Sequence, residues 1–268
     1  MHIINLTDQY KKSFCMCLEE WSDEMQEAGD HKEHWLEKMQ DKGLGVKLAL
    51  HDNGRVGGMI QYVPIEHSPA EGKNLYFINC IWVHGHKQGQ GNMQKQGMGK
   101  ALLQAAEEDV RNRGAGGLAA WGLAIPVFMQ ASWFKKHGYK KADNIGLQQL
   151  LWKRFTDNAE PPRWIRQQKP PALIPGKVSV TMFMNGWCPA QNLVYERVKR
   201  AVTGFGNDVV MQKIDTCDRT NFLEWGISDA LFIDNKQIRT GPPPSFDKIS
   251  KEIGKRVKKL QKKQSGRK

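Results

Sequence analysis

The sequence lacks long apolar runs. Its longest unbroken apolar stretches are short, as in Ile125–Met129, whereas a helix that crosses a bilayer needs roughly 20 apolar residues. The first residues do not combine a basic region with a following apolar stretch, so we expect no secretory signal. We therefore expect no membrane partner and a cytoplasmic location.

Cysteine is also scarce. The five cysteines are an odd number and lie far apart: Cys15, Cys17, Cys80, Cys188 and Cys217. So sparse a set in a cytoplasmic chain does not indicate a disulfide framework. Cys15 and Cys17 have no second Cys/His pair near them, so we predict no metal site.

Acidic residues are fewer than basic ones, but the excess is local. The formal net charge is +12, of which residues 1–155 contribute +2, residues 156–250 contribute +2 and residues 251–268 contribute +8. Such a terminal run can attract polyanions. Charged ends are more commonly solvated and frayed. We therefore predict a solubilising basic tail, and no nucleic-acid partner.

The composition predicts a folded chain of one large or two smaller domains. Hydrophobic residues make up 40% of its 268 residues and charged residues 25%, which is typical of globular proteins. Residues 156–176 hold five prolines, which favour a semi-rigid linker. We expect a first domain over residues 1–155, this linker, a second domain over 177–250 and the basic tail over 251–268.

The first domain shows alternating strand and helix patterns. We expect strands at 3–6, 46–50, 56–63, 75–84, 118–123 and 147–155. Helical patterns cover 10–42, with a break at 28–30, as well as 100–113 and 127–137. This order is typical of an α/β or α+β domain with a mixed central sheet.

The most informative segment is a glycine loop between a predicted strand and a predicted helix. It reads Gln94-Lys95-Gln96-Gly97-Met98-Gly99-Lys100. A junction of this kind directs unpaired backbone N–H groups at one spot, where the helix dipole also favours an anion. Glycine lets the backbone approach a pyrophosphate closely. The spacing is Gln-x-x-Gly-x-Gly, which fits neither the Walker loop nor the dinucleotide fingerprint.

In this motif the sequence resembles the GNAT superfamily of N-acetyltransferases, whose acyl-CoA signature is Arg/Gln-x-x-Gly-x-Gly/Ala. The later run Trp133-Phe134-Lys135-Lys136-His137-Gly138-Tyr139 is similar to a second family pattern, Phe-Tyr-x-x-x-Gly-Phe. The resemblance covers about residues 1–155. It implies the GNAT acyl-CoA N-acyltransferase fold, acetyl-CoA as cosubstrate and an amine-bearing acceptor.

The resemblance also implies roles for individual residues. The N–H groups of Gln96–Lys100 would hold the pyrophosphate, and strand 77–83 would splay from the next strand to admit the pantetheine arm. A backbone N–H near Trp82 or Val83 would polarise the thioester carbonyl. The implied cofactor-binding residues are Trp82, Val83, Gln94, Lys95, Gln96, Gly97, Met98, Gly99 and Lys100.

The sequence departs from the family pattern at three points. The loop between Val83 and Gln94 is about five residues longer than usual. Phe134 stands where many relatives place the tyrosine that protonates the leaving thiolate, and Val127 stands where an asparagine often contacts the cofactor. For the general base, the candidates are His84 and His86, just beyond the strand end.

Acidic residues are dense over Glu19–Asp41, which holds nine carboxylates. In the GNAT superfamily the equivalent helices flank the acceptor site. A negative rim there would concentrate cationic amines. The alternative for most of these residues is a solvated helix face.

The second domain resembles a degenerate thioredoxin-like module. Trp187-Cys188-Pro189-Ala190-Gln191 follows a predicted strand and opens a predicted helix. A redox pair needs Cys-x-x-Cys, and Gln191 stands at the second position. Asp229 stands where such folds place a cis-proline. An acetyltransferase followed by such a module resembles the YoaP-like acetyltransferases.

The sequence therefore predicts an acetyl-CoA-dependent N-acetyltransferase with an accessory C-terminal domain. One alternative is a thiol-handling acyltransferase that uses or senses Cys188. Another is a non-catalytic acyl-CoA-binding module, which the departures at Val127 and Phe134 leave open. The acceptor, the physiological acyl group and the oligomeric state, including a homodimer, are not determined by the sequence.

Overall fold

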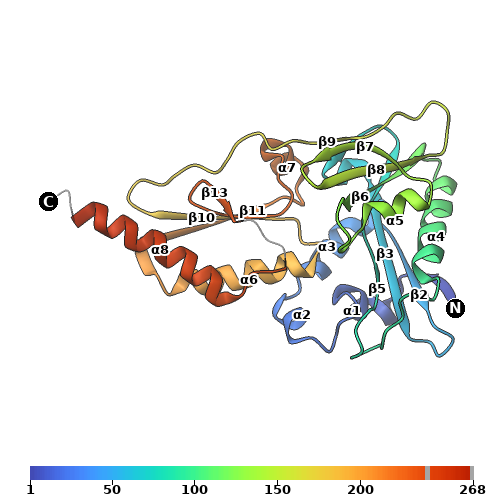
Figure 1. Cartoon of the computed structure of the whole chain (residues 1–268), viewed down its shortest axis with the longest axis horizontal. Coiled ribbons are helices and arrows are strands. Elements are labelled where there is room, and N and C mark those ends of the chain that lie inside the picture. The colour runs from blue at the N-terminus through green and yellow to red at the C-terminus, as the bar shows by residue number, and fades with distance from the viewer. Residues whose placement is uncertain (239–241, 266–268) are drawn as a thin grey trace. The chain divides into compact units, whose positions relative to one another are not determined.

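The computed structural model describes residues 1–238 and 242–265. The chain divides into two compact units. The first unit comprises Met1–Ser22 and Leu36–Ile165, and the second comprises Asp23–Trp35 and Arg166–Lys268. Both are visible along the chain in Figure 1. Within the described ranges, no helix combines the length and apolarity needed to span a membrane.

The first unit is built on a seven-stranded mixed sheet in the order β1-β2-β3-β5-β6-β8-β7. Only β5 and β6 pair in parallel, and the other neighbours in this sheet are antiparallel. The strands are β1 (His2–Asn5), β2 (Gly45–Leu50), β3 (Val56–Pro64), β5 (Leu75–Val83), β6 (Gly117–Leu123), β7 (Lys140–Ile145) and β8 (Gln148–Arg154). The sheet confirms the predicted α/β class.

Helices cover this sheet because their apolar residues recur every three or four positions. The helices of the unit are α1 (Asp8–Cys15), α4 (Met98–Asn112) and α5 (Ala131–Lys136), together with the second half of α3 (His31–Gln40), whose residues up to Trp35 belong to the second unit. On α4 the buried residues include Leu102, Ala106 and Val110, which face the sheet as one stripe. They join Ile60 and Phe134 in the main core of the unit.

Two predicted segments of the first unit differ from the structure. The predicted helix 127–137 begins only at Ala131, because Val127 and Phe128 carry exposed side chains and the buried Met129 has a left-handed φ of 51°, which a helix does not allow. Part of the predicted linker is also ordered. There β9 (Arg163–Trp164) pairs with β4 (Ala70–Glu71), and Trp164 is buried against Phe77.

The second unit has a four-stranded sheet in the order β11-β10-β12-β13. Its strands are β10 (Val178–Met184), β11 (Val209–Asp215), β12 (Ala230–Ile233) and β13 (Lys236–Ile238). The central strand β10 pairs in parallel with β11 and antiparallel with β12. Its helices are α2 (Asp23–Glu27), α6 (Pro189–Thr203), α7 (Arg219–Trp225) and α8 (Phe246–Ser265).

The basic tail is not frayed as predicted. Residues 251–265 continue α8, and Ile249, Ile253 and Val257 bury one stripe of this helix in the core of the unit. The spacing of four residues keeps these three side chains on one helix face while the lysines remain exposed. The last three residues of the predicted tail, 266–268, lie outside the described residues.

Candidate active site

The parallel strands β5 and β6 separate part-way along their length. Their pairing runs from Leu75 and Gly117 to Ile78 and Ala120 and goes no further. Beyond that point, β5 continues to Val83 along β3 only. Asn79 is the extra residue where the β3–β5 register shifts, so the bulge coincides with the end of pairing. The gap between these strands agrees with the splay that the sequence predicts.

A cavity of about 810 Å³ lies at this gap, within the size range of ligand pockets. It brings together every residue predicted to bind the cofactor except Gln96. They are Trp82, Val83, Gln94, Lys95, Gly97, Met98, Gly99 and Lys100. Gln96 lies just outside, where its side chain donates to the carbonyl oxygen of Asn92.

The glycine loop has the geometry of an anion cradle. Gly97 caps α4 with a φ of 83°, a left-handed conformation that favours glycine. A Cβ atom added at Gly97 would meet nothing within 4 Å, so the space beside the loop is open. The N–H groups of Met98, Gly99 and Lys100 lie in the first turn of α4, where no helical carbonyl can accept from them. These donors fit a pyrophosphate.

The orientation of the Val83 N–H follows from the pairing of its neighbour. His84 donates its backbone N–H to the carbonyl oxygen of Gly57 on β3. Because successive N–H groups of a strand point to opposite edges, the Val83 N–H points to the edge that β6 has left. A donor at this edge is suited to an oxyanion that develops in the gap. Of the two residues that the sequence predicts for this role, the geometry favours Val83.

The opposite wall of the cavity is apolar and comes from residues that sequence reasoning did not assign to the cofactor. Phe128, Met129 and Trp133 line it, together with the two departures from the family pattern, Val127 and Phe134. Phe134 is buried completely, whereas 46% of Val127 is exposed. An apolar wall suits the pantetheine arm. The signal in the sequence was the run 125–129, which resembled a helix because all of its members are apolar or proline.

His84, a predicted candidate for the base, is buried and fully hydrogen-bonded. Its Nδ1 lies 2.7 Å from the carbonyl oxygen of Gly91, and its Nε2 accepts from Trp21 Nε1 at 3.3 Å. A proton on Nδ1 satisfies the carbonyl, and the lone pair on Nε2 is then occupied by the indole. This arrangement leaves neither nitrogen for a substrate proton. His84 instead fixes the long loop and the Trp21 ring.

His86, the other candidate, is differently placed. Its Nε2 lies 3.4 Å from Oε1 of Glu19, and about half of its side chain (49%) is exposed. If the hydrogen on Nε2 faces Glu19, then Nδ1 keeps a lone pair that can accept a proton. The carboxylate, whose side chain is only 18% exposed, would stabilise the imidazolium that forms. Of the two histidines, His86 is therefore the one with a ring nitrogen left for a substrate proton, and neither histidine is among the residues that line the cavity.

The remaining acidic residues of Glu19–Asp41 do not form one rim. Glu24 and Glu27 instead pair with Arg197 on α6 inside the second unit. Glu20 accepts a hydrogen bond from Ser13. Glu19 is the carboxylate of this set that meets a candidate catalytic residue.

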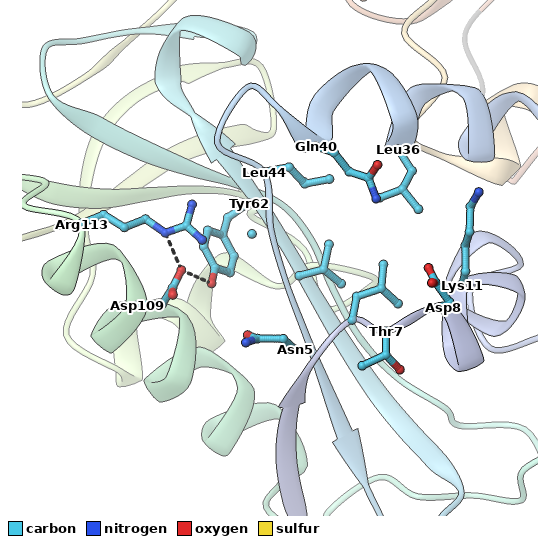
Figure 2. Close-up of a pocket in the computed structure, with 13 residues that line it drawn as sticks. Asn5, Thr7, Asp8, Lys11, Leu36, Gln40, Leu44, Tyr62, Asp109 and Arg113 are labelled. Carbon is cyan, nitrogen blue, oxygen red and sulfur yellow. Dashed lines mark hydrogen bonds and ion pairs between the residues drawn. The ribbon is translucent and has the colours of Figure 1, made fainter.

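A second cavity of about 260 Å³ lies elsewhere in the first unit (Figure 2). Tyr62 donates its hydroxyl to Asp109 at 2.7 Å, and Arg113 Nε lies 2.8 Å from the same carboxylate. The pKa of Asp109 is lowered overall: burial opposes this most strongly, but Tyr62, Arg113 and Lys47 together outweigh it. None of the predicted site residues lies here.

In the second unit, Cys188 is the N-cap of α6 and is partly exposed. Asp229 lies at the entrance to β12 and accepts from the backbone N–H of Asn185 and from Ser228. Within the part of the chain that the structure describes, no three His, Cys, Asp or Glu side chains gather in a way that could hold a metal ion.

The comparison with known families decides what the first unit is. The sequence model of the acetyltransferase (GNAT) family matches residues 5–139, about half of the chain. The chain belongs to the GNAT acetyltransferase family. The matched range includes the splayed strands, the glycine loop and both histidines.

The sequence identities to individual relatives are low. The "Uncharacterized N-acetyltransferase YoaP" of Bacillus subtilis (strain 168) is 26% identical over 170 residues, which are 60% of this chain. The match spans 62% of the length of that relative. A GNAT acetyltransferase of Brucella melitensis, solved with acetyl-CoA, is 17% identical, with 58% of this chain and 88% of that chain covered and a TM-score of 0.37. YhbS of Escherichia coli, solved with CoA, is 11% identical, with 61% of this chain and 88% of that chain covered and a TM-score of 0.43.

Proposed function

We propose that this protein transfers the acetyl group of acetyl-CoA to a primary amine. The observation that carries the proposal is the cavity that joins the unpaired end of β5 to the glycine loop, whose N–H donors lie at the start of α4. Acetyl-CoA supplies an acetyl group activated as a thioester. The loop donors would hold its pyrophosphate, and the gap would take its pantetheine arm.

The residues of the chain then divide the work of transfer. The Val83 N–H donates to the carbonyl oxygen as negative charge develops there. His86 accepts the ammonium proton on Nδ1, and Glu19 stabilises the resulting imidazolium. The amine lone pair forms the C–N bond, and the C–S bond breaks with its electron pair on sulfur, while the second proton that the nitrogen loses passes to water. Phe134 has no proton to donate to that sulfur, but the thiolate leaves readily because the pKa of a thiol is about 8.5.

We also propose that the second unit is an accessory domain of thioredoxin-like fold. Its order β10-α6-β11-α7-β12-β13-α8, with β10 central and parallel to β11, supports this assignment. Glutamine stands at position 191, so the sequence does not have the Cys-x-x-Cys motif here, and dithiol exchange in this motif is not part of the proposal.

The full chain tests this proposal in two steps. Calorimetric titration with CoA and acetyl-CoA measures binding, and thiol release with a panel of amines measures transfer, with mass spectrometry to identify the acetylated product. We expect micromolar binding and thiol release that depends on both substrates. Binding without amine-dependent release would support the non-catalytic acyl-CoA-binding alternative instead.

A further inference from the structure

A continuous row of rings leads from the cavity to the surface of the first unit. It consists of Trp121, Phe128, Trp82, His86 and Trp21, which we call the aromatic wall. Neighbouring ring centroids are 5.9, 5.8, 6.2 and 5.5 Å apart in this order. These separations lie in the range of aromatic contacts. Because Trp82 and Phe128 line the cavity, the wall connects the site of transfer with solvent.

The wall leaves apolar surface exposed. Phe128 is 44% exposed and Trp21 is 37% exposed. Ile125 and Val127, from the same irregular segment as Phe128, are also among the exposed large apolar side chains of the described residues. Adjacent exposed apolar groups beside a cavity indicate a binding surface.

The unusually long loop after β5 holds the outer end of the wall in place. His84 accepts from the Trp21 indole and is itself held by Gly91, and the Met93 N–H donates to the His84 carbonyl oxygen. Gly89 passes directly against the Trp21 ring, since a Cβ atom there would lie 2.1 Å from Cδ1 of the indole. The residues of this loop therefore hold the Trp21 ring through direct contact and through His84.

Charge at the wall is negative where the amine must react. Glu19 faces His86, whose ring stands between those of Trp21 and Trp82 in the order of the aromatic wall. A protonated amine is attracted both by this carboxylate and by the faces of tryptophan rings. The Lys95 and Lys100 side chains belong instead to the glycine loop of the cavity, where they suit phosphate groups.

We infer that the acceptor is an arylalkylamine, a compound in which a short carbon chain joins an aromatic ring to a primary amine. Its ring packs on Trp21 and Trp82, and its ammonium approaches Nδ1 of His86, whose Nε2 faces Glu19. The inference rests on the proposed acetyltransferase function. It assigns a binding role to Trp21 and a positioning role to His84 and Gly89.

The test compares two amines of similar chain length, 2-phenylethylamine and n-butylamine, with the full-length protein. We expect kcat/KM for 2-phenylethylamine to exceed that for n-butylamine by at least about 10-fold, since aromatic packing contributes on the order of 1 kcal/mol or more in addition to apolar burial. Trp21→Leu should lower this preference by about 10-fold, chiefly through KM. The Kd for CoA should stay within about 2-fold, because Trp21 is outside the cavity lining.

Two glycine variants form a matched pair. Gly89→Ala forces the Trp21 ring to move, whereas Gly54→Ala, in the turn between β2 and β3, meets nothing within 4 Å although both glycines have a positive φ. Gly89→Ala should therefore reduce the preference for 2-phenylethylamine as Trp21→Leu does, and Gly54→Ala should preserve it. Equal kcat/KM for the two amines in the unaltered protein, or a preference unchanged by both Trp21→Leu and Gly89→Ala, would overturn the inference.

A binding measurement separates this inference from the proposed function. Calorimetric titration of the CoA complex with 2-phenylethylamine measures acceptor binding without turnover. Binding of this amine, lost in Trp21→Leu, with no transfer to any amine would support the acceptor site and contradict the acetyltransferase proposal. Transfer to n-butylamine and other aliphatic amines, with no binding of 2-phenylethylamine, would support the acetyltransferase proposal and contradict the arylalkylamine site.

Discussion

The indole N–H of Trp121 donates to the backbone carbonyl oxygen of Asn79 at 2.7 Å. This bond lies where β5 and β6 have stopped pairing, one residue beyond Ile78 and Ala120. A parallel sheet that separates leaves unpaired backbone groups at both edges, and each buried one costs free energy unless it finds a partner. Trp121 supplies one partner from a side chain. The gap can then stay open for a substrate, with the Asn79 carbonyl oxygen satisfied.

The cofactor loop can be tested at Gly97. Gly97→Ala should weaken CoA binding by about 10-fold or more, because a left-handed φ is strained for alanine and the loop N–H donors would shift from the phosphates. Calorimetric titration measures the effect. Gly91→Ala is the matched control, since its φ of 77° is similar and it lies outside the cavity. Equal losses in both variants would show that general loop strain, and not phosphate contact, is responsible.

The roles of the two histidines predict different pH profiles. His86→Gln should lower kcat/KM by about 100-fold or more near neutral pH, the range typical of a lost general base. The deficit should shrink as the pH rises toward the pKa of the amine, because an unprotonated amine needs no base. His84→Asn should instead weaken acceptor binding and keep the shape of the profile. A pH-independent loss in His86→Gln would contradict its assignment as the base.

The ion pairs of Arg197 should contribute measurably to stability. Its guanidinium is 9% exposed and contacts Glu24 and Glu27 at 2.8 and 2.9 Å. Burial acts most strongly to lower the pKa of Arg197, but the hydrogen bonds to both glutamates reverse this and raise it. Arg197→Met should destabilise the second unit by about 1–3 kcal/mol in urea denaturation. Arg200→Gln, at an exposed position that also pairs with Glu27, should cost less than about 1 kcal/mol.

The carboxyl group of Asp229 should make the free energy of unfolding depend on pH. Burial raises the pKa of its carboxyl, although hydrogen bonds from the Asn185 N–H and Ser228 partly oppose this. The folded protein therefore holds this proton more tightly than the unfolded chain, and the contribution of Asp229 to stability falls as pH rises from the unfolded pKa through the folded one. Asp229→Asn should flatten this loss and raise the unfolding temperature at neutral pH. A lower unfolding temperature there would contradict the prediction.

Much of the fold could be predicted from local patterns. Strands 56–63 and 118–123 were predicted to within one residue of the bounds that the structure has, because each is a short, mainly apolar run that follows turn residues. The glycine loop could be located because its spacing is local in sequence. The mixed sheet followed from the order of elements. These features need no knowledge of distant contacts.

Other features escaped prediction for physical reasons. The edge strand β7 is largely exposed, so it shows no alternation of apolar residues. In α8 the three buried residues are separated by lysines, and net charge alone obscured their helical spacing. Trp21, which donates to His84, and Glu19, which faces His86, each lie more than 60 residues away in sequence. Which of the two histidines keeps a free lone pair is therefore a tertiary property.

The boundary between the two units carries an evolutionary consequence. Residues 23–35 are inserted in the sequence of the acetyltransferase unit, yet they fold with the second unit, where Arg197 binds Glu24 and Glu27. The two units are therefore not separable at one point in the sequence. Truncation of the chain after residue 165 would remove Arg197, the partner of Glu24 and Glu27 in residues 23–35. Substitutions on α6 and in residues 23–35 should co-vary, and recombination that exchanges one unit alone should leave Glu24 and Glu27 without Arg197. We therefore expect the coding sequences of the two units to stay together in evolution.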